Sequence, residues 1–177
     1  MPALQGECTD QVDVISERGD VRRLVDVSAT QGHIVPTSIT FHGGVFYLGN
    51  LGVLGPGSQG HANVYRLTRT GSLSLLKSGL TAVVGVAVHD SHVYALESFT
   101  GVAPTPDVAD TGTVVRLNRR TGNWDTVVTG LSFPTAMTFG PDGNLYVSNK
   151  GFVLGQPANH AGEVVKVALQ GHDEDDD

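Results

Sequence analysis

Three polar residues occupy the same place in three stretches of the chain that are similar to one another. Asn50, Glu97 and Asn149 each follow a short apolar run that contains a tyrosine. Their side chains offer amide and carboxylate oxygens, the donors that Ca²⁺ and Mg²⁺ prefer. We therefore take these three residues as candidate metal ligands, with Ca²⁺ as the candidate cofactor. The alternative is that Asn and Glu at strand ends cap the backbone of the following loop.

Two of the seven histidines lie where a catalytic base would be useful. His61 and His160 each end a long loop, 51–61 and 151–161, just before equivalent apolar segments. Imidazole titrates near neutral pH, so either histidine beside Glu97 or Asp110 would make an acid/base pair. The candidate catalytic residues are thus His61, His160 and Glu97, and the alternative is that both histidines are loop residues without a chemical role.

The sequence lacks several motifs that would name an enzyme class. It has no His-Glu-x-x-His spacing, no Gly-x-Ser-x-Gly elbow and no phosphate-binding glycine loop. Its single cysteine, Cys8, excludes an internal disulfide and a cysteine-based zinc site. The first eight residues lack the basic and apolar regions of a signal peptide, so the sequence does not indicate a compartment.

Charge and hydropathy exclude two kinds of partner. The net charge is −7, and five of the acidic residues are the last five, Asp173 to Asp177. The remainder is close to neutral and has no basic patch, which argues against nucleic-acid binding. No run of 18 apolar residues is present, so we expect no membrane span.

Internal repeats define the elements that must position these candidates. Glycine (23 residues), valine and threonine are abundant, which favours strands and turns. Phe41 to Val88 is 47 positions and Val88 to Phe139 is 51, and each repeat begins with two apolar segments joined by a turn. Third strands are expected at 62–67, 112–117 and 162–167, and fourth strands at 72–77 and 123–128. Four antiparallel strands in about 50 residues are typical of a β-propeller blade.

The predicted fold is all-β, a propeller with about three four-stranded blades. We expect an N-terminal segment (1–10), a half-propeller (11–170) and a disordered acidic tail (171–177). The blades span about 32–80, 81–131 and 132–169, with 11–27 as outer strands. Because propellers usually have four to eight blades, we expect two copies to close a six-bladed ring as a homodimer. The alternative is that the chain is a fragment of a longer propeller.

From about residue 12 to residue 169 the chain resembles the C-terminal half of the ScyD/ScyE family of propeller proteins. The resemblance rests on the segment Gly140–Asn149, with Pro134-Thr135 before it and Gly162–Val167 after it, and on Val35–Ser38 with Val64–Leu67. It implies a six-bladed, usually exported protein. The Gly-Pro-Asp-Gly-Asn-Leu-Tyr-Val core also occurs in gluconolactonase-like and streptogramin-lyase-like propellers.

The resemblance also bears on the metal site. Gluconolactonase-like and phosphotriesterase-like propellers place Asn and Asp calcium ligands where this chain has Thr37, Val84 and Thr135. Thr37, Thr135 and Ser38 would instead line the channel with hydroxyls, and they are the candidate ligand-binding residues. An ordinary strand role for threonine is the alternative.

Two functions follow from these observations. The first is a propeller module without a recognisable catalytic motif, which binds a small ligand, a metal or a partner on its loop face. The alternative is a metal-dependent hydrolase of lactones, esters or phosphotriesters, with its site on the propeller axis.

Overall fold

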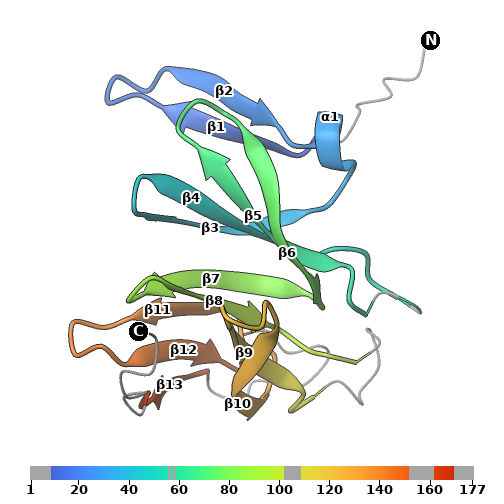
Figure 1. Cartoon of the computed structure of the whole chain (residues 1–177), viewed down its shortest axis with the longest axis vertical. Helices are drawn as coiled ribbons and strands as arrows, with labels where there is room; N and C mark the ends of the chain where they lie inside the picture. The colour runs from blue at the N-terminus through green and yellow to red at the C-terminus, as the bar shows by residue number, and fades with distance from the viewer. Residues whose placement is uncertain (1–8, 56, 58, 102–108, 152–161, 170–177) are drawn as a thin grey trace.

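A computed structural model of the chain describes residues 9–55, 57, 59–101, 109–151 and 162–169, which form a stack of antiparallel sheets (Figure 1). Within these residues there are thirteen strands and one short helix, α1 (Ser28–Gln31). The first sheet contains β1 (Gln11–Ile15) and β2 (Val21–Asp26). The second contains β3 (Pro36–His42), β4 (Val45–Asn50), β5 (Ala62–Thr68) and β6 (Leu73–Leu80). The third contains β7 (Val83–His89), β8 (His92–Glu97), β9 (Gly112–Leu117) and β10 (Trp124–Leu131), and the fourth contains β11 (Ala136–Phe139), β12 (Leu145–Asn149) and β13 (Glu163–Val167).

Each sheet is ordered along the chain, and the first strands of the last three sheets lie beside one another. β7 contacts both β3 and β11, so the three innermost strands run through the middle of the stack. The layers bury apolar side chains between them, including Val64, Val83 and Val86 on one side of β7 and Leu96, Val114 and Val147 on the other. Alternation of side chains across each strand is what lets one sheet pack on both neighbours.

Tight turns set the register of the hairpins. Gly43 and Gly44 both have positive φ, at 57° and 85°, between β3 and β4. Asp90 and Ser91 adopt positive φ in the same place between β7 and β8. Two central residues with positive φ define the turn whose twist suits a two-residue hairpin. These two turns set the register of β4 and β8, while a longer turn, residues 140–144 with Gly143 at φ 72°, joins β11 to β12.

Close approach of the inner strands depends on one glycine. A Cβ atom on Gly49 would lie 2.7 Å from Val83 Cγ1 and 2.8 Å from Val86 Cγ2. Any larger residue on this part of β4 would push β7 away, so glycine is needed for the second and third sheets to pack.

The two ends of the stack are unequal. At one end, Val12, Val25 and Val27 from the β1–β2 segment pack over Leu48 and Tyr65, which covers the outer strands of the second sheet. The face of β3 stays uncovered there, and Ile39 and Phe41 are 49% and 48% exposed. At the other end the fourth sheet has three strands, and Val164 on its outer strand β13 is 71% exposed.

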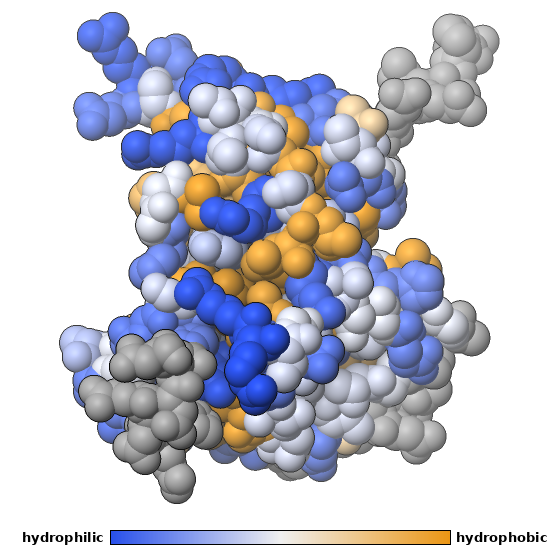
Figure 2. Space-filling model, in the orientation of Figure 1, coloured by the Kyte–Doolittle hydropathy of each residue, from blue (hydrophilic) through white to orange (hydrophobic). Residues whose placement is uncertain are grey.

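The surface reflects this incomplete covering. Figure 2 shows apolar side chains interrupting the hydrophilic surface in the middle of the stack, over β5 and β6. Leu75 on β6 is one of the large apolar residues that are exposed. The part of the chain that the structure describes contains no helix long and apolar enough to cross a membrane.

The all-β class and the antiparallel four-stranded sheets expected from the repeats are confirmed. β2 lies with β1 at the end of the stack opposite β13 (Figure 1), so within one chain it does not supply the fourth strand of the last sheet. The number of blades in a closed ring and its closure by two copies stay predictions. The acidic tail and the first eight residues lie outside the described residues.

Candidate functional site

An unusual backbone conformation precedes each innermost strand. Val35, Ala82 and Phe133 have φ of 57°, 47° and 44°, in the left-handed region that residues with a Cβ atom rarely adopt. The three residues come immediately before Pro36, Val83 and Pro134, so this is one feature repeated three times. Such a conformation costs on the order of 1–3 kcal/mol and persists only where neighbouring contacts impose it.

Asn50, Glu97 and Asn149 make those contacts. Asn50 Nδ2 donates to the carbonyl of Ile34 at 2.8 Å. The backbone N–H of Thr81 donates to Glu97 Oε1 at 2.5 Å, and that of Ser132 donates to Asn149 Oδ1 at 2.8 Å. Each side chain thus holds the residue just before the left-handed one, and all three side chains are buried. We call this set of three the strand clamps.

The two amide clamps have little capacity left for a metal. Asn50 Oδ1 also accepts the backbone N–H of Asn63 at 2.7 Å, and Asn149 Nδ2 donates to Glu163 Oε1 at 2.8 Å. Both polar atoms of each amide are therefore engaged in hydrogen bonds within the chain. These are the bonds that the capping alternative describes, and the donor set as arranged fits Ca²⁺ poorly. Among the described residues no group of three or more His, Cys, Asp or Glu is placed to hold a metal ion.

Glu97 differs from the other clamps because it can ionise. Burial disfavours its charged form and raises its pKa to about 7, while the hydrogen bond from the Thr81 N–H acts in the opposite direction. Near neutral pH the carboxyl is consequently divided between its acid and base forms. A carboxyl in that state can donate or accept a proton, as a general acid or base does.

Two of the three candidate hydroxyls, those of Thr37 and Ser38, lie on the innermost strand β3, and Thr135 comes immediately before β11. Thr37 Oγ1 lies 2.5 Å from the carbonyl oxygen of Val83 and so links β3 to β7. Thr135 Oγ1 donates to Ser148 Oγ at 3.3 Å across β11 and β12. Ser38 Oγ is buried without a hydrogen-bond partner among the described residues. Whether these groups meet a ligand stays a prediction.

Of the candidate histidines, only His61 lies within the described residues. Its side chain is exposed, and its backbone carbonyl accepts a hydrogen bond from Asn63 Nδ2 at 3.4 Å. No hydrogen bond or ion pair within the described ranges joins His61 to Glu97. His160 and most of the loop before it lie outside these ranges.

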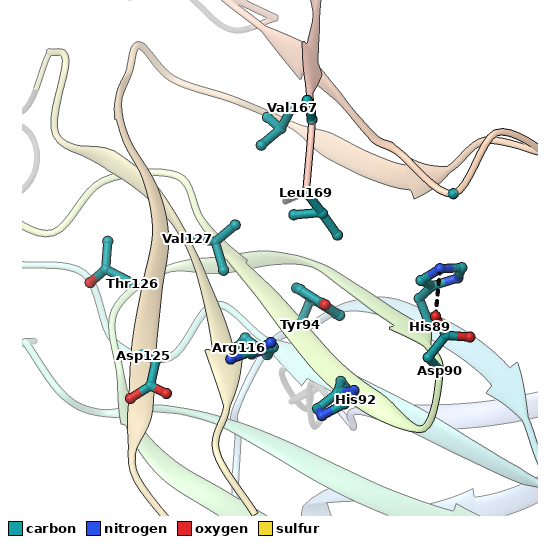
Figure 3. Close-up of a pocket in the computed structure, with 12 residues that line it drawn as sticks. His89, Asp90, His92, Tyr94, Arg116, Asp125, Thr126, Val127, Val167 and Leu169 are labelled. Carbon is teal, nitrogen blue, oxygen red and sulfur yellow. Dashed lines mark ion pairs between the residues drawn. The ribbon is translucent and has the colours of Figure 1, made fainter. Parts of the chain in front are cut away.

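Residues that the sequence analysis did not single out line a groove of about 710 Å³ at the hairpin ends of β7 and β8 (Figure 3). This end is opposite the strand clamps, since Glu97 ends β8 and His92 begins it. We call this cavity the hairpin groove. The residues that line it are His89, Asp90, His92, Tyr94, Arg116, Asp125, Thr126, Val127, Gly143, Val167, Ala168 and Leu169.

Arg116 is the only lysine or arginine among the residues that line the hairpin groove, and two carboxylates, Asp90 and Asp125, line it as well. Asp90 pairs with His89 at 3.1 Å, and Asp125 Oδ2 accepts a hydrogen bond from Asn118 Nδ2 at 2.8 Å. Arg116, beside Tyr94 in Figure 3, forms no ion pair within the described part of the chain. Burial raises the pKa of Tyr94, and Arg116 opposes that rise through its charge and a hydrogen bond. The arginine thus faces the groove with a neutral phenol beside it.

Apolar residues close the other side of the hairpin groove. Val127 of β10 faces Val167 and Leu169, which come from the last sheet (Figure 3). The groove can therefore hold a molecule with an anionic group at one end and an apolar body at the other. Cross-strand alignment of Tyr94, Arg116 and Asp125 could have revealed this site in the sequence, had the register been known.

Solved structures with a similar fold are propellers of greater length. A luciferin-regenerating enzyme matches 80% of this chain and 49% of its own, with a TM-score of 0.55 and 13% identity. A gluconolactonase-like protein matches 89% of this chain and 56% of its own, with a TM-score of 0.56 and 15% identity. An auxiliary nutrient binding protein from Bacteroides thetaiotaomicron matches 78% of this chain and 31% of its own, with a TM-score of 0.53 and 15% identity.

These likenesses establish the propeller fold. The chain spans about half the length of the luciferin-regenerating enzyme and of the gluconolactonase-like protein. Comparison of the sequence with protein families and with curated proteins gives no match. The more specific ScyD/ScyE resemblance therefore stays a prediction.

The raised pKa of Glu97 makes a prediction about stability. In the unfolded chain this carboxyl titrates at its ordinary value of 4.5, whereas in the folded chain it titrates at about 7. The folded state holds the proton more tightly, so this contribution to the unfolding free energy is complete below about 4.5 and is lost as the pH rises through 7. We expect the contribution to be roughly 2–3 kcal/mol between pH 8 and pH 5.

Denaturant unfolding of the native chain and of Glu97→Gln at both pH values measures this contribution. The glutamine keeps an oxygen for the Thr81 N–H but does not titrate, so its unfolding free energy should change less with pH. Subtracting the pH-dependent change in unfolding free energy of Glu97→Gln from that of the native chain removes the effect of other titrating groups. Equal pH dependence in both would contradict the assignment.

Proposed function

We propose that this chain is a non-catalytic propeller module that binds a small organic anion in the hairpin groove. The observation that carries the proposal is Arg116, which faces the groove without an ion-pair partner within the described residues, while both groove carboxylates have partners. A carboxylate, phosphate or sulfate group on the ligand would take the guanidinium, which matches such groups in a bidentate geometry.

The size of the hairpin groove supports the same proposal. Ligand sites commonly enclose 300–1,000 Å³ and combine apolar walls with a few polar groups. The groove has about 710 Å³ with Val127, Val167 and Leu169 opposite Arg116. The loop face is the other proposed place for a ligand, but there Thr37 already bonds to a neighbouring strand and Ser38 is buried.

Binding of 2-naphthoate, which has an apolar body and one carboxylate, tests the proposal by titration calorimetry. Replacement of Arg116 by Met should weaken binding by about 10–100-fold, because a hydrogen-bonded charge contributes about 1.5–3 kcal/mol. Arg66→Met is the matched control, since Arg66 pairs with Tyr47 in the preceding sheet as Arg116 pairs with Tyr94. Equal affinity of the two variants, or no binding to the native chain, would overturn the proposal.

We also propose that two copies close one ring. Among the described residues the terminal sheets have two and three strands, whereas the two middle sheets have four, so each end of the described stack has fewer strands than the middle. A second copy offers the missing layers at both ends at once. The length supports this, because the chain covers 49% of the luciferin-regenerating enzyme.

Light scattering during size exclusion at micromolar concentration tests ring closure. The expected mass is twice 18.6 kDa for a homodimer. A stable mass of 18.6 kDa would contradict closure by a second copy and would favour the alternative that the chain is part of a longer propeller.

A second candidate is a metal-dependent hydrolase of lactones, esters or phosphotriesters, and the titration of Glu97 near neutrality favours it. Metal analysis and turnover of chromogenic esters and phosphotriesters, with and without chelator, test it. Chelator-sensitive turnover that disappears in Glu97→Ala would support the hydrolase. No bound metal and no turnover would leave the binding module.

A further inference from the structure

We infer that a second copy docks the outer face of its β11–β13 sheet on the exposed face of β3, with Phe41 against Tyr146 of that copy. This inference rests on the proposed ring closure and names the surfaces that would perform it. The evidence is a contact between neighbouring sheets that occurs twice within the chain, once between the second and third sheets and once between the third and fourth.

Each innermost strand presents two apolar residues to the sheet before it. On β7 these are Val86 and Val88, which pack against the second sheet. On β11 they are Met137 and Phe139, which pack against the third sheet. The two pairs occupy equivalent positions on their strands, since Val88 lies opposite Val93 and Phe139 lies opposite Leu145 at the hairpin ends.

The corresponding pair on β3 is Ile39 and Phe41. Phe41 lies opposite Phe46 near the β3–β4 turn, in the register of Val88 and Phe139. Both residues are about half exposed, because the sheet before them contributes β1 and β2 to the outer strands and no strand beside β3. Phe46 and Arg69 contact the Phe41 ring at centroid distances of 4.8 Å and 5.3 Å. The pair therefore presents apolar area that lacks the partner its two equivalents have.

The surface that receives such a pair is also repeated. Tyr47 and Val88 pack against the same apolar cluster in the first junction, and the Tyr94 ring contacts Phe139 edge-on at 5.0 Å in the second. The third tyrosine of the series is Tyr146, on β12. Its hydroxyl donates to Asp142 at 2.9 Å, and Lys166 lies 5.8 Å from its ring centre.

Small residues beside the tyrosines permit close approach. A Cβ atom on Gly85 would lie 3.2 Å from Met137 Cγ, so the two sheets approach closely at this position of β7 and a larger residue would require Met137 to shift. The equivalent residue on β11 is Ala136, which lies opposite Ser148 as Gly85 lies opposite Leu96. Ala136 is exposed. One end of the chain thus carries the presenting pair, and the other end carries the receiving surface.

A second copy is the occupant that fits both ends. One copy's β3 face meets the other copy's β11–β13 face, and the same contact occurs again on rotation by half a turn. β11 and β12 of one copy then lie on β3 of the other, where no strand of the first sheet covers it. β13 comes to the place where β1 of the other copy packs through Val12, so one of these two outer strands must shift for the copies to dock.

Two variants, each altered at one of the two surfaces, test the inference. Phe41→Arg and Tyr146→Glu should each remove the dimer when studied alone, because each homodimer would contain the altered contact twice. Mixed in equal amounts they should form a heterodimer, since one junction is then native and the other pairs Arg with Glu. We expect a rise of at least 100-fold in the dimer dissociation constant for each variant alone, and recovery of most of the dimer in the mixture.

Sedimentation velocity of the full chain gives the masses, and circular dichroism checks that each variant keeps its strands. Val53→Arg, an exposed loop position, is the control and should remain dimeric. Variants that stay dimeric alone, or that fail to combine although folded, would overturn this interface while leaving ring closure intact. A monomeric native chain would overturn ring closure itself and the interface with it.

Discussion

A buried polar side chain holds the backbone at the start of every innermost strand. The chain must turn sharply there to leave the rim of one sheet and begin the centre of the next, and Val35, Ala82 and Phe133 take left-handed φ to do so. The strand clamps Asn50, Glu97 and Asn149 bond to the residues just before them. Because these bonds are shielded from water, loss of one would leave buried groups unpaired. The position of the inner strands, and hence of both ends of the stack, depends on them.

The strand clamps illustrate which features of the fold the sequence predicts and which it does not. Their equivalence follows from the repeat alone, and so do the hairpins and the four-stranded sheets. Their role does not, because the same oxygens that suit a cation also accept backbone N–H groups. Choosing between the two requires knowing that Ile34, Thr81 and Ser132 lie within hydrogen-bond distance, which is a property of the folded backbone.

The hairpin groove was beyond prediction for a related reason. Tyr94 and Arg116 come from strands β8 and β9, between which lie residues 98–111, and Val167 and Leu169 come from the end of a different sheet and the residues after it. Only the register between β8 and β9 and the packing of the third sheet on the fourth bring them together. Of the histidines that sequence spacing suggested, His61 lies at the other end of the strands and His160 lies outside the described residues, so their catalytic role stays a prediction.

The two ends of each sheet thus have different chemistry. At the loop end, polar groups are buried and hydrogen-bonded to the backbone, which suits them to holding the fold. At the hairpin end, charged and aromatic groups face an open groove, which suits them to meeting something from solution. A propeller divided in this way can change its ligand without disturbing the bonds that keep its strands in place.

The uncovered face of β3 has one more consequence. It differs from the surface at the opposite end of the stack, so every copy that joins by this contact leaves another uncovered face behind it. A closed ring forms only where the rotations that relate successive copies add up to a full turn. Otherwise the same contact repeats and produces open fibres. If two copies close a ring as proposed, the angle between neighbouring sheets decides closure, and a bulkier residue in place of Gly49, which would displace β7, would favour open polymers over the closed dimer.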